Sequence, residues 1–425
     1  MQITRQMSEA QWVGQVYARV PPRLLWTADR VFRYAMTMAQ RRLPITRFEG
    51  PLAGSGESAR VVVIDHQASV AHFVQQLFDG PVEPQPAGET TWHRLPETLD
   101  RLAQATDLLL ARFHAGVGGR RLDARYLRIP EAVECHAELP EDKSLPARAR
   151  RGQSGNLRVL RRSTLRWELS HDNADFAQFY RQMYVPFAER RFGELASVRS
   201  AQRLRSHFLR GGLIRVLDGD TWVGGTVYSV EGDRLRVWVV GVIEGDMAQS
   251  ERGVMTANWA FAFERAQQLD LRYCHMGLSR PSLRDGVLVY KKRWGAALRD
   301  GHPTHVDLFT RWDRFNPTVA RLLEVSPLLF RDGPRFAGLA VLNEPATADA
   351  VERVALELAM PGLRRMCVLA PGVERVQRCG LQDARVRDLD LQLMPQVGSG
   401  RLGRLLEDQP EPAMTGAKRE QVTAS

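Results

Sequence analysis

The stretch LIRVLDGDTWVGGTVYSVEGDRLRVWVVGVI at residues 213–243 decides the fold. It contains three runs rich in valine, leucine and other strand-forming residues: Leu213–Asp218, Trp222–Glu231 and Arg234–Ile243. Glycine-aspartate turns at 218–220 and 231–233 separate these runs, and turns this short join antiparallel strands. The stretch therefore predicts a three-stranded antiparallel sheet.

The residues that follow predict how this sheet continues. A polar loop at 244–253 leads into Val254–Gln268, which is apolar nearly all round and so predicts a buried helix. A strand at Arg272–Gly277, a short helix at Asp285–Trp294 and a last strand at His305–Arg311 come next. We expect residues 204–311 to form one mixed sheet, with the strand at 272–277 beside the strand at 234–243. These two strands should diverge at the loop end and open a cleft.

Alternating strand and helix signals continue on both sides of this core. The predicted fold class is α/β (α+β), with a mixed sheet and packed helices in the middle and further small α/β units flanking it. The expected division is an N-terminal α/β domain at 1–140 whose first 50 residues are helical, a core at 141–315 and a C-terminal α/β unit at 316–400. Residues 401–425 are expected to be a tail without packed structure.

Composition excludes several classes of protein. The 425 residues are 44% hydrophobic and 25% charged, which is ordinary for a globular chain and excludes disorder throughout. No stretch approaches the ~18 consecutive apolar residues of a membrane span. The four cysteines form no CxxC pair, which argues against a disulfide framework and a cysteine zinc site. We expect a protein of the reducing cytoplasm that holds no metal.

The positive charge is concentrated in one segment. The formal net charge is +10, and residues 143–168 contain eight basic residues against the single acid Glu168. This segment predicts a local anionic partner, namely a phosphate-bearing substrate, an RNA such as tRNA, or an anionic surface. Arg150 and Arg151 are its candidate substrate-binding residues.

The stretch HMGLSRPSLRDGVLVYKKRWG at 275–295 carries a resemblance to a known family. Its matching positions are Met276-Gly277, Ser279-Arg280-Pro281, Gly286, Tyr290-Lys291 and Trp294-Gly295. In these residues the chain resembles the Fem-type branch of the GNAT superfamily, which includes single-chain bacterial acyltransferases and aminoacyl-transferring peptidoglycan ligases. A basic stretch at 140–163 is similar too, and the resemblance covers roughly 130–311.

The resemblance implies an enzyme, an N-acyltransferase. It would move an acetyl or longer acyl group from an acyl-CoA, such as acetyl-CoA, to an amine of a small molecule, glycan or peptide, for example a cell-envelope or polysaccharide precursor. Of the usual cofactor loop only Gly253 matches, so a charged tRNA remains an alternative donor. A third alternative is a non-catalytic RNA- or polyanion-binding protein on a degraded acyltransferase fold. The sequence carries no signal for an oligomeric state.

The cofactor loop corresponds to Ser250, Arg252, Gly253 and Val254. Backbone N–H groups at the start of a helix favour a phosphate, and glycine permits close approach. Arg252 could add a charged hydrogen bond. The alternative interpretation is a capped buried helix in which Ser250 is only the N-cap.

The candidate catalytic residues lie on either side of this loop. Lys291 could stabilise an oxyanion or a phosphate, and Tyr290 could protonate a leaving group. Glu244, or Asp246 beside it, could be the base that deprotonates the acceptor amine, and Arg280 could clamp an anion. A solvated Lys-Lys-Arg helix face and a solvated loop acid remain the alternatives for these positions.

Overall fold

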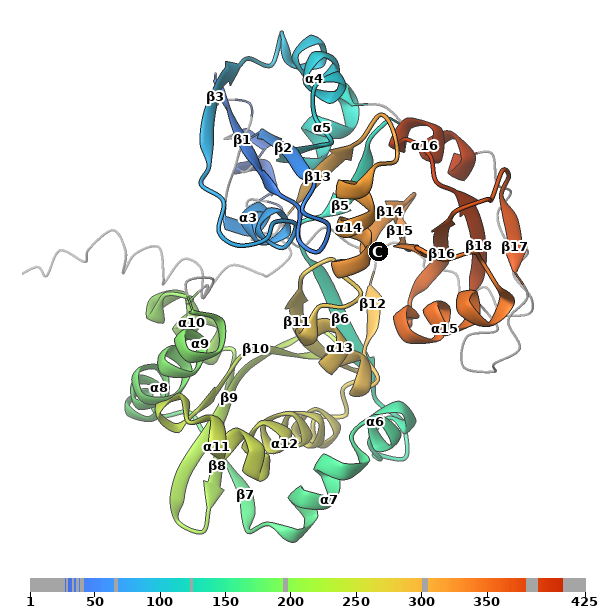
Figure 1. Cartoon of the computed structure of the whole chain (residues 1–425). Helices are drawn as coiled ribbons and strands as arrows, with labels where there is room; N and C mark the ends of the chain where they lie inside the picture. The colour runs from blue at the N-terminus through green and yellow to red at the C-terminus, as the bar shows by residue number, and fades with distance from the viewer. Residues whose placement is uncertain are drawn as a thin grey trace, which may run out of the picture.

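The computed structural model of the chain describes residues 42–64, 68–122, 125–193, 198–299, 305–379 and 389–407, with a few positions between 27 and 38. These residues form three mixed sheets of six, seven and five strands, each with helices packed on it (Figure 1). The fold is mixed α/β, as predicted. None of the helices in the described part of the chain combines the length and apolar character needed to cross a bilayer.

The seven-stranded sheet is built mainly from the middle of the chain and is called the central sheet. Its strands, in spatial order, are β12 (Ala297–Arg299), β6 (Val133–Glu138), β11 (Tyr273–Ser279), β10 (Arg234–Val242), β9 (Thr221–Glu231), β8 (Gly211–Asp218) and β7 (Leu165–Ser170). The predicted antiparallel strands are β8, β9 and β10. The three antiparallel strands, the buried helix, the parallel strand and the short helix follow one another in the order that the sequence predicted.

β10 and β11 pair in parallel over only three positions, from Arg234 with Tyr273 to Arg236 with His275. Immediately beyond them β10 shifts register against β9 between Val237 and Val239, which places a bulge at Trp238. The predicted divergence of the two strands therefore begins at the bulge.

Helices cover both faces of the central sheet. α12 (Met255–Gln268) is buried against one face, where Phe263 and Ala266 are fully enclosed, and this confirms the predicted buried helix. The other face carries α8 (Asn173–Phe179), the π-turn η1 (Tyr180–Tyr184), α9 (Val185–Phe192) and α10 (Ala201–Phe208). Side-chain caps fix where these helices begin: Asp172 accepts from Ala174 N–H and Ser200 accepts from Arg203 N–H.

Two smaller units flank this sheet. The first has the strand order β3 (Gln85–Thr90), β1 (Leu43–Pro51), β2 (Ser58–Ile64), β4 (Leu108–His114), β13 (Val306–Arg311), β5 (Leu127–Pro130), with helices α3 (Ala68–Gln75), α4 (Leu95–Gln104) and α5 (Ala115–Arg121). The second has the order β14 (Leu328–Asp332), β15 (Arg335–Val341), β16 (Leu363–Ala370), β18 (Asp390–Pro395), β17 (Gln377–Cys379), with α14 (Pro317–Val325), α15 (Ala348–Leu358) and α16 (Ser399–Glu407).

Strand pairing crosses the boundaries that the sequence predicted. β6 lies in the expected N-terminal domain but pairs with β11, whereas β13 belongs to the first sheet and not to the sheet of 204–311. β1 falls within the stretch expected to be helical, and α10 covers a stretch expected to begin a strand. Pairing partners are chosen by the tertiary fold, so a local pattern does not reveal them.

The C-terminal helix also corrects a prediction. Residues 401–407, expected to begin an unstructured tail, are the main part of α16, because Leu402 is fully buried against the first and third units. Ser399 anchors this helix by donating from Oγ to Arg125 O at 2.6 Å. Residues 408–425 lie outside the described residues.

The first and third units are held together by a buried carboxylate. Asp307 on β13 is completely buried and pairs with Arg128 on β5 at 2.9 Å and with Arg331 on β14 at 2.9 Å. Removing one member of such a buried group leaves uncompensated charge, which costs about 3–5 kcal/mol.

The Asp307→Ala substitution should therefore lower the free energy of unfolding by about 3–5 kcal/mol, because Arg128 and Arg331 then lose their acidic partner. Urea denaturation measures this. The control is Asp270→Asn, since Asp270 is exposed and pairs with Lys143 on the surface, and it should change stability by less than about 1 kcal/mol. Equal losses in both variants would contradict the assigned role.

Candidate functional site

A cavity of about 220 Å³ opens at the start of α12. It lies between α7 (Ser154–Arg162), α9, the π-turn η4 (Ser250–Val254), α12 and α13 (Gly286–Arg293). Its lining residues are Asn156, Val159, Arg191, Ser250, Glu251, Gly253, Met255, Thr256 and Tyr290. Two predictions from separate parts of the sequence, the loop at 250–254 and Tyr290, thus meet at one cavity.

The loop residues divide between cavity, core and surface. Ser250 and Gly253 line the cavity, and the Ser250 hydroxyl is buried without a hydrogen-bond partner. Gly253 has a φ of +107° that kinks the helix, and a Cβ there would meet Val159 at an ordinary 3.5 Å. Glycine is therefore required here by the backbone angle. A larger side chain would have enough room. Val254 is buried in the core and Arg252 is exposed, and neither lines the cavity.

Tyr290 also lines the cavity and carries a second polar atom without a hydrogen bond. Its hydroxyl is buried beside Trp294, whose ring packs edge-on against the Tyr290 ring, and it makes no hydrogen bond of normal geometry. Burial raises the pKa of Tyr290 to about 12, so the phenol stays protonated at neutral pH. Buried hydroxyls without a partner are rare and costly, and a polar ligand in the cavity would satisfy both this group and Ser250.

Lys291 and Lys292 are adjacent on α13 but have different surroundings. Lys291 is only 3% exposed, and its Nζ donates to Leu278 O at 2.7 Å and to Ser279 Oγ at 3.0 Å. Lys292 donates to Glu357 O across the boundary with the third unit. Lys291 is therefore a buried residue beneath β11 that does not line the cavity, so it is not part of a solvated helix face. Its proposed catalytic role stays untested.

The other predicted residues lie apart from the cavity. Glu244 is exposed in the short 3-10 turn η3 (Ile243–Gly245), and Asp246 caps the next turn by accepting from Ala248 N–H. Arg280 is half-buried after the end of β11. Arg150 and Arg151 are exposed on α6 (Ala147–Gly152), which immediately precedes the cavity-lining helix α7.

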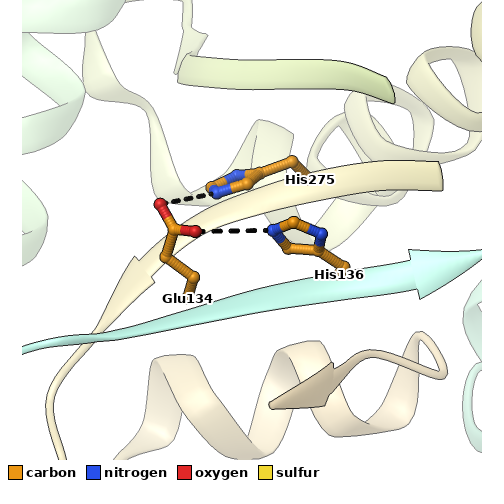
Figure 2. Close-up of side chains that lie close together, drawn as sticks. All are labelled: Glu134, His136 and His275. Atoms are coloured by element: carbon orange, nitrogen blue, oxygen red, sulfur yellow. Dashed lines mark ion pairs between the residues drawn. The ribbon is translucent and has the colours of Figure 1, made fainter. Parts of the chain in front are cut away.

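Sequence reasoning missed a polar cluster on the opposite face of the sheet. Glu134, His136 and His275 project together from β6 and β11 (Figure 2). His275 Nε2 lies 3.1 Å from Glu134 Oε1, and His136 Nε2 lies 3.6 Å from Oε2. The two histidines are directly opposite in the sheet register, a pairing that no local sequence signal indicates.

Among the described residues, these three side chains form a cluster of possible metal ligands, because all their ligand atoms lie within 4.8 Å of one another. Two contacts argue against a metal. Gly277 N–H donates to His275 Nδ1 at 2.9 Å, which leaves the proton on Nε2, the atom that would have to bind the metal. Arg236 also holds Glu134 Oε1 at 3.2 Å. The cluster therefore fits a carboxylate that holds two neutral histidines and an arginine.

Comparisons with known proteins give likenesses of fold only. No family model matches the chain, and no curated protein matches it. FemX matches with a TM-score of 0.33 at 11% identity, covering 71% of this chain and 96% of that one. L-PGS from Bacillus licheniformis matches with a TM-score of 0.32 at 10% identity, covering 65% and 87%. A GCN5-related N-acetyltransferase from Sphaerobacter thermophilus matches with a TM-score of 0.29 at 13% identity, covering 61% and 78%.

Burial lowers the pKa of Lys291 below its value in the unfolded chain. Its desolvation penalty is therefore fully present below the folded pKa and is relieved as pH rises toward about 10.5. The stability of the wild type relative to Lys291→Met should accordingly increase with pH over that window. Urea denaturation of both proteins between neutral pH and pH ~10 measures the difference. A difference that stays constant or falls would contradict the burial of the charged amine.

Proposed function

We propose that this protein is an N-acyltransferase whose acyl donor enters the cavity at the start of α12. One observation carries the proposal: Ser250 and Tyr290, whose buried hydroxyls make no hydrogen bond of normal geometry, line the same cavity. The cavity adjoins the first turn of α12, the helix that packs beneath the parting strands β10 and β11. A polar ligand that reaches along this helix would satisfy both groups.

The preferred donor is an acyl-CoA such as acetyl-CoA. The cavity of about 220 Å³ is smaller than the ~300–1,000 Å³ of pockets that enclose whole ligands, so it suits the acyl-pantetheine end alone. The nucleotide end would then lie outside, toward α7. Ser250, Gly253 and Tyr290 would contact the donor, and Arg191 adds a positive charge at the rim.

The reaction needs little from the protein beyond positioning. A neutral amine attacks the thioester carbonyl, the new C–N bond forms as the C–S bond breaks, and the amine loses a proton while the thiol gains one. Tyr290, protonated at neutral pH, can donate a hydrogen bond to the sulfur as negative charge develops there. The acceptor class is a primary amine on a small molecule, glycan or peptide, including precursors of the cell envelope.

A charged tRNA is the second candidate donor, and the basic face of α6 and α7 favours it. The arginines on these helices are exposed, and none of them pairs with an acid in the described ranges of the chain; they are Arg148, Arg150, Arg151, Arg158, Arg161 and Arg162. Asn156 and Val159 of α7 line the cavity, so a phosphate backbone held by this face would place its 3′ end nearby. The same face could instead hold the phosphates of coenzyme A.

Tyr290→Phe tests the catalytic assignment. Loss of the hydroxyl should reduce acetyl transfer to a panel of primary amines by about 10²-fold, while acetyl-CoA binding changes by less than about tenfold. Thiol release measures turnover and calorimetry measures binding. The folding stability should be unchanged or slightly higher, because a buried unpaired hydroxyl is removed.

The matched control is Tyr126→Phe, in the first unit, which should leave turnover unchanged. Equal turnover in Tyr290→Phe and the wild type would contradict the role of Tyr290. Absence of acetyl-CoA binding to the wild type would contradict the preferred donor.

Arg150 and Arg151 test the basic face. The double change to alanine should weaken binding of acetyl-CoA or of charged tRNA and reduce the slope of log affinity against log salt by about 0.7–0.9 for each lost phosphate contact. Binding measured at several salt concentrations for both ligands identifies the donor. Arg401 and Arg404 are exposed on α16 and provide the control double variant, which should bind as the wild type does. A slope unchanged for both ligands would remove the basic face from donor binding.

A further inference from the structure

Arginine and aromatic side chains gather on the face of the central sheet away from α12. Trp238, at the bulge of β10, stacks on His207 of α10 with ring centroids 3.4 Å apart and an interplanar angle of 14°. The guanidinium carbons of Arg236 and Arg199 lie 4.5 Å and 5.4 Å from the centre of the Trp238 ring. These four residues are named the Trp238 cluster. It packs with the helices α8–α10, whereas the preceding Val237 packs with α12.

Positive charge in this cluster exceeds negative charge. Arg236 is paired with Glu134 and Glu231, but Arg199 has no carboxylate partner within the described residues, although its side chain is partly buried. Burial and the neighbouring arginines lower the pKa of His207 to about 2, so this histidine is neutral and contributes no charge. A partly desolvated guanidinium without an acid is unfavourable, and a bound oxyanion would compensate it.

The backbone holds Arg199 in place before any ligand binds. Its N–H donates to Tyr184 Oη at 2.9 Å, and its C=O accepts from Tyr180 Oη at 3.0 Å. Both tyrosines belong to η1, a π-turn inside an otherwise α-helical segment, and such turns are frequent at functional sites. A residue fixed in this way loses less entropy when it binds a ligand.

The Trp238 cluster lies across the sheet from the donor cavity. Arg236 and His275 are the last residues at which β10 and β11 pair, and Trp238 follows at the bulge. The cavity lies at the start of α12, which follows the end of β10. A molecule held at Arg199 can therefore extend a second group into the gap between the strands, toward a donor that approaches from the other face.

We propose that the Trp238 cluster binds an anionic group, a carboxylate or a phosphate, of the amine that accepts the acyl group. The proposal rests on the proposed acyltransferase function. The guanidinium of Arg199 pairs with the anion, and the acceptor's neutral amine attacks the thioester carbon. The C–N bond forms as the C–S bond breaks, and the proton lost by nitrogen leaves with the thiol.

Binding is tested at Trp238 itself, without any reaction. The nine tryptophans are labelled with 5-fluorotryptophan, and the ¹⁹F resonance that is missing in Trp238→Phe identifies Trp238. Titration with inorganic phosphate and with succinate, against chloride at equal ionic strength, should shift this resonance saturably with at least one probe. The dissociation constant should rise at least about tenfold in Arg199→Gln.

Arg205→Gln is the matched control, because Arg205 is on α10, which begins just after Arg199, but bonds Asn173; it should bind the probe as the wild type does. No saturable shift up to roughly tens of millimolar, or an equal shift in Arg199→Gln, would overturn the proposal. A shift with succinate alone indicates a carboxylate, and a shift with phosphate alone indicates a phosphate.

Acceptor choice is tested with matched amines: an amino acid and its amide, and phosphoethanolamine and ethanolamine. The wild type should prefer one anionic member at least about tenfold in kcat/KM, and Arg199→Gln should lose this preference through KM. Equal use of both members would overturn the acceptor role. If the ¹⁹F resonance shifts but the protein binds no acetyl-CoA, the anion site is supported and the proposed donor is refuted. Failure of the anion site and failure of the proposed donor are therefore distinguishable.

Discussion

The parting of β10 and β11 determines the geometry of the rest of the central unit. The two strands share three paired positions, and a bulge at Trp238 then turns β10 away from its neighbour. An extra residue in one strand of a pair bends that strand and interrupts the ladder. The parallel strand also requires a crossover, which α12 provides, so the helix start, the opening and the cavity lie at the same end of the sheet.

In this arrangement, one layer of sheet separates two groups of side chains that differ in charge. On the α12 side, the cavity presents neutral hydroxyls, and its charged groups are at the rim. On the other side, Glu134 holds Arg236 and two histidines, and the Trp238 cluster adds Arg199, which pairs with no acid in the described part of the chain. Burial lowers the pKa of His136, His275 and His207, so these histidines are neutral at pH 7. The positive charge of the far face is therefore on guanidinium groups. A thioester and an anionic amine could therefore be bound on opposite faces and meet at the opening.

The local patterns predicted most of the central sheet. Glycine-aspartate turns and valine-rich runs between 213 and 243 located three strands, because hairpin turns and strand propensity are local properties. The apolar composition of 254–268 located a buried helix for the same reason. Patterns failed where the structure depends on distant partners: α10 formed where the predicted sheet was expected to begin, and β6 joined a sheet whose other strands lie beyond residue 164.

The sequence by itself determined the type of most central elements, α10 excepted, and identified Tyr290 and Gly253 as candidates. Tertiary structure alone decided that these two residues share a cavity, that Lys291 is buried against Leu278 O, and that Arg252 and Glu244 are exposed. The physical reason is that helix and strand formation depend on neighbours in the chain, whereas burial and hydrogen-bond partners depend on packing between distant segments. His136 and His275 illustrate this, since 138 intervening residues separate two side chains whose rings lie 4.3 Å apart.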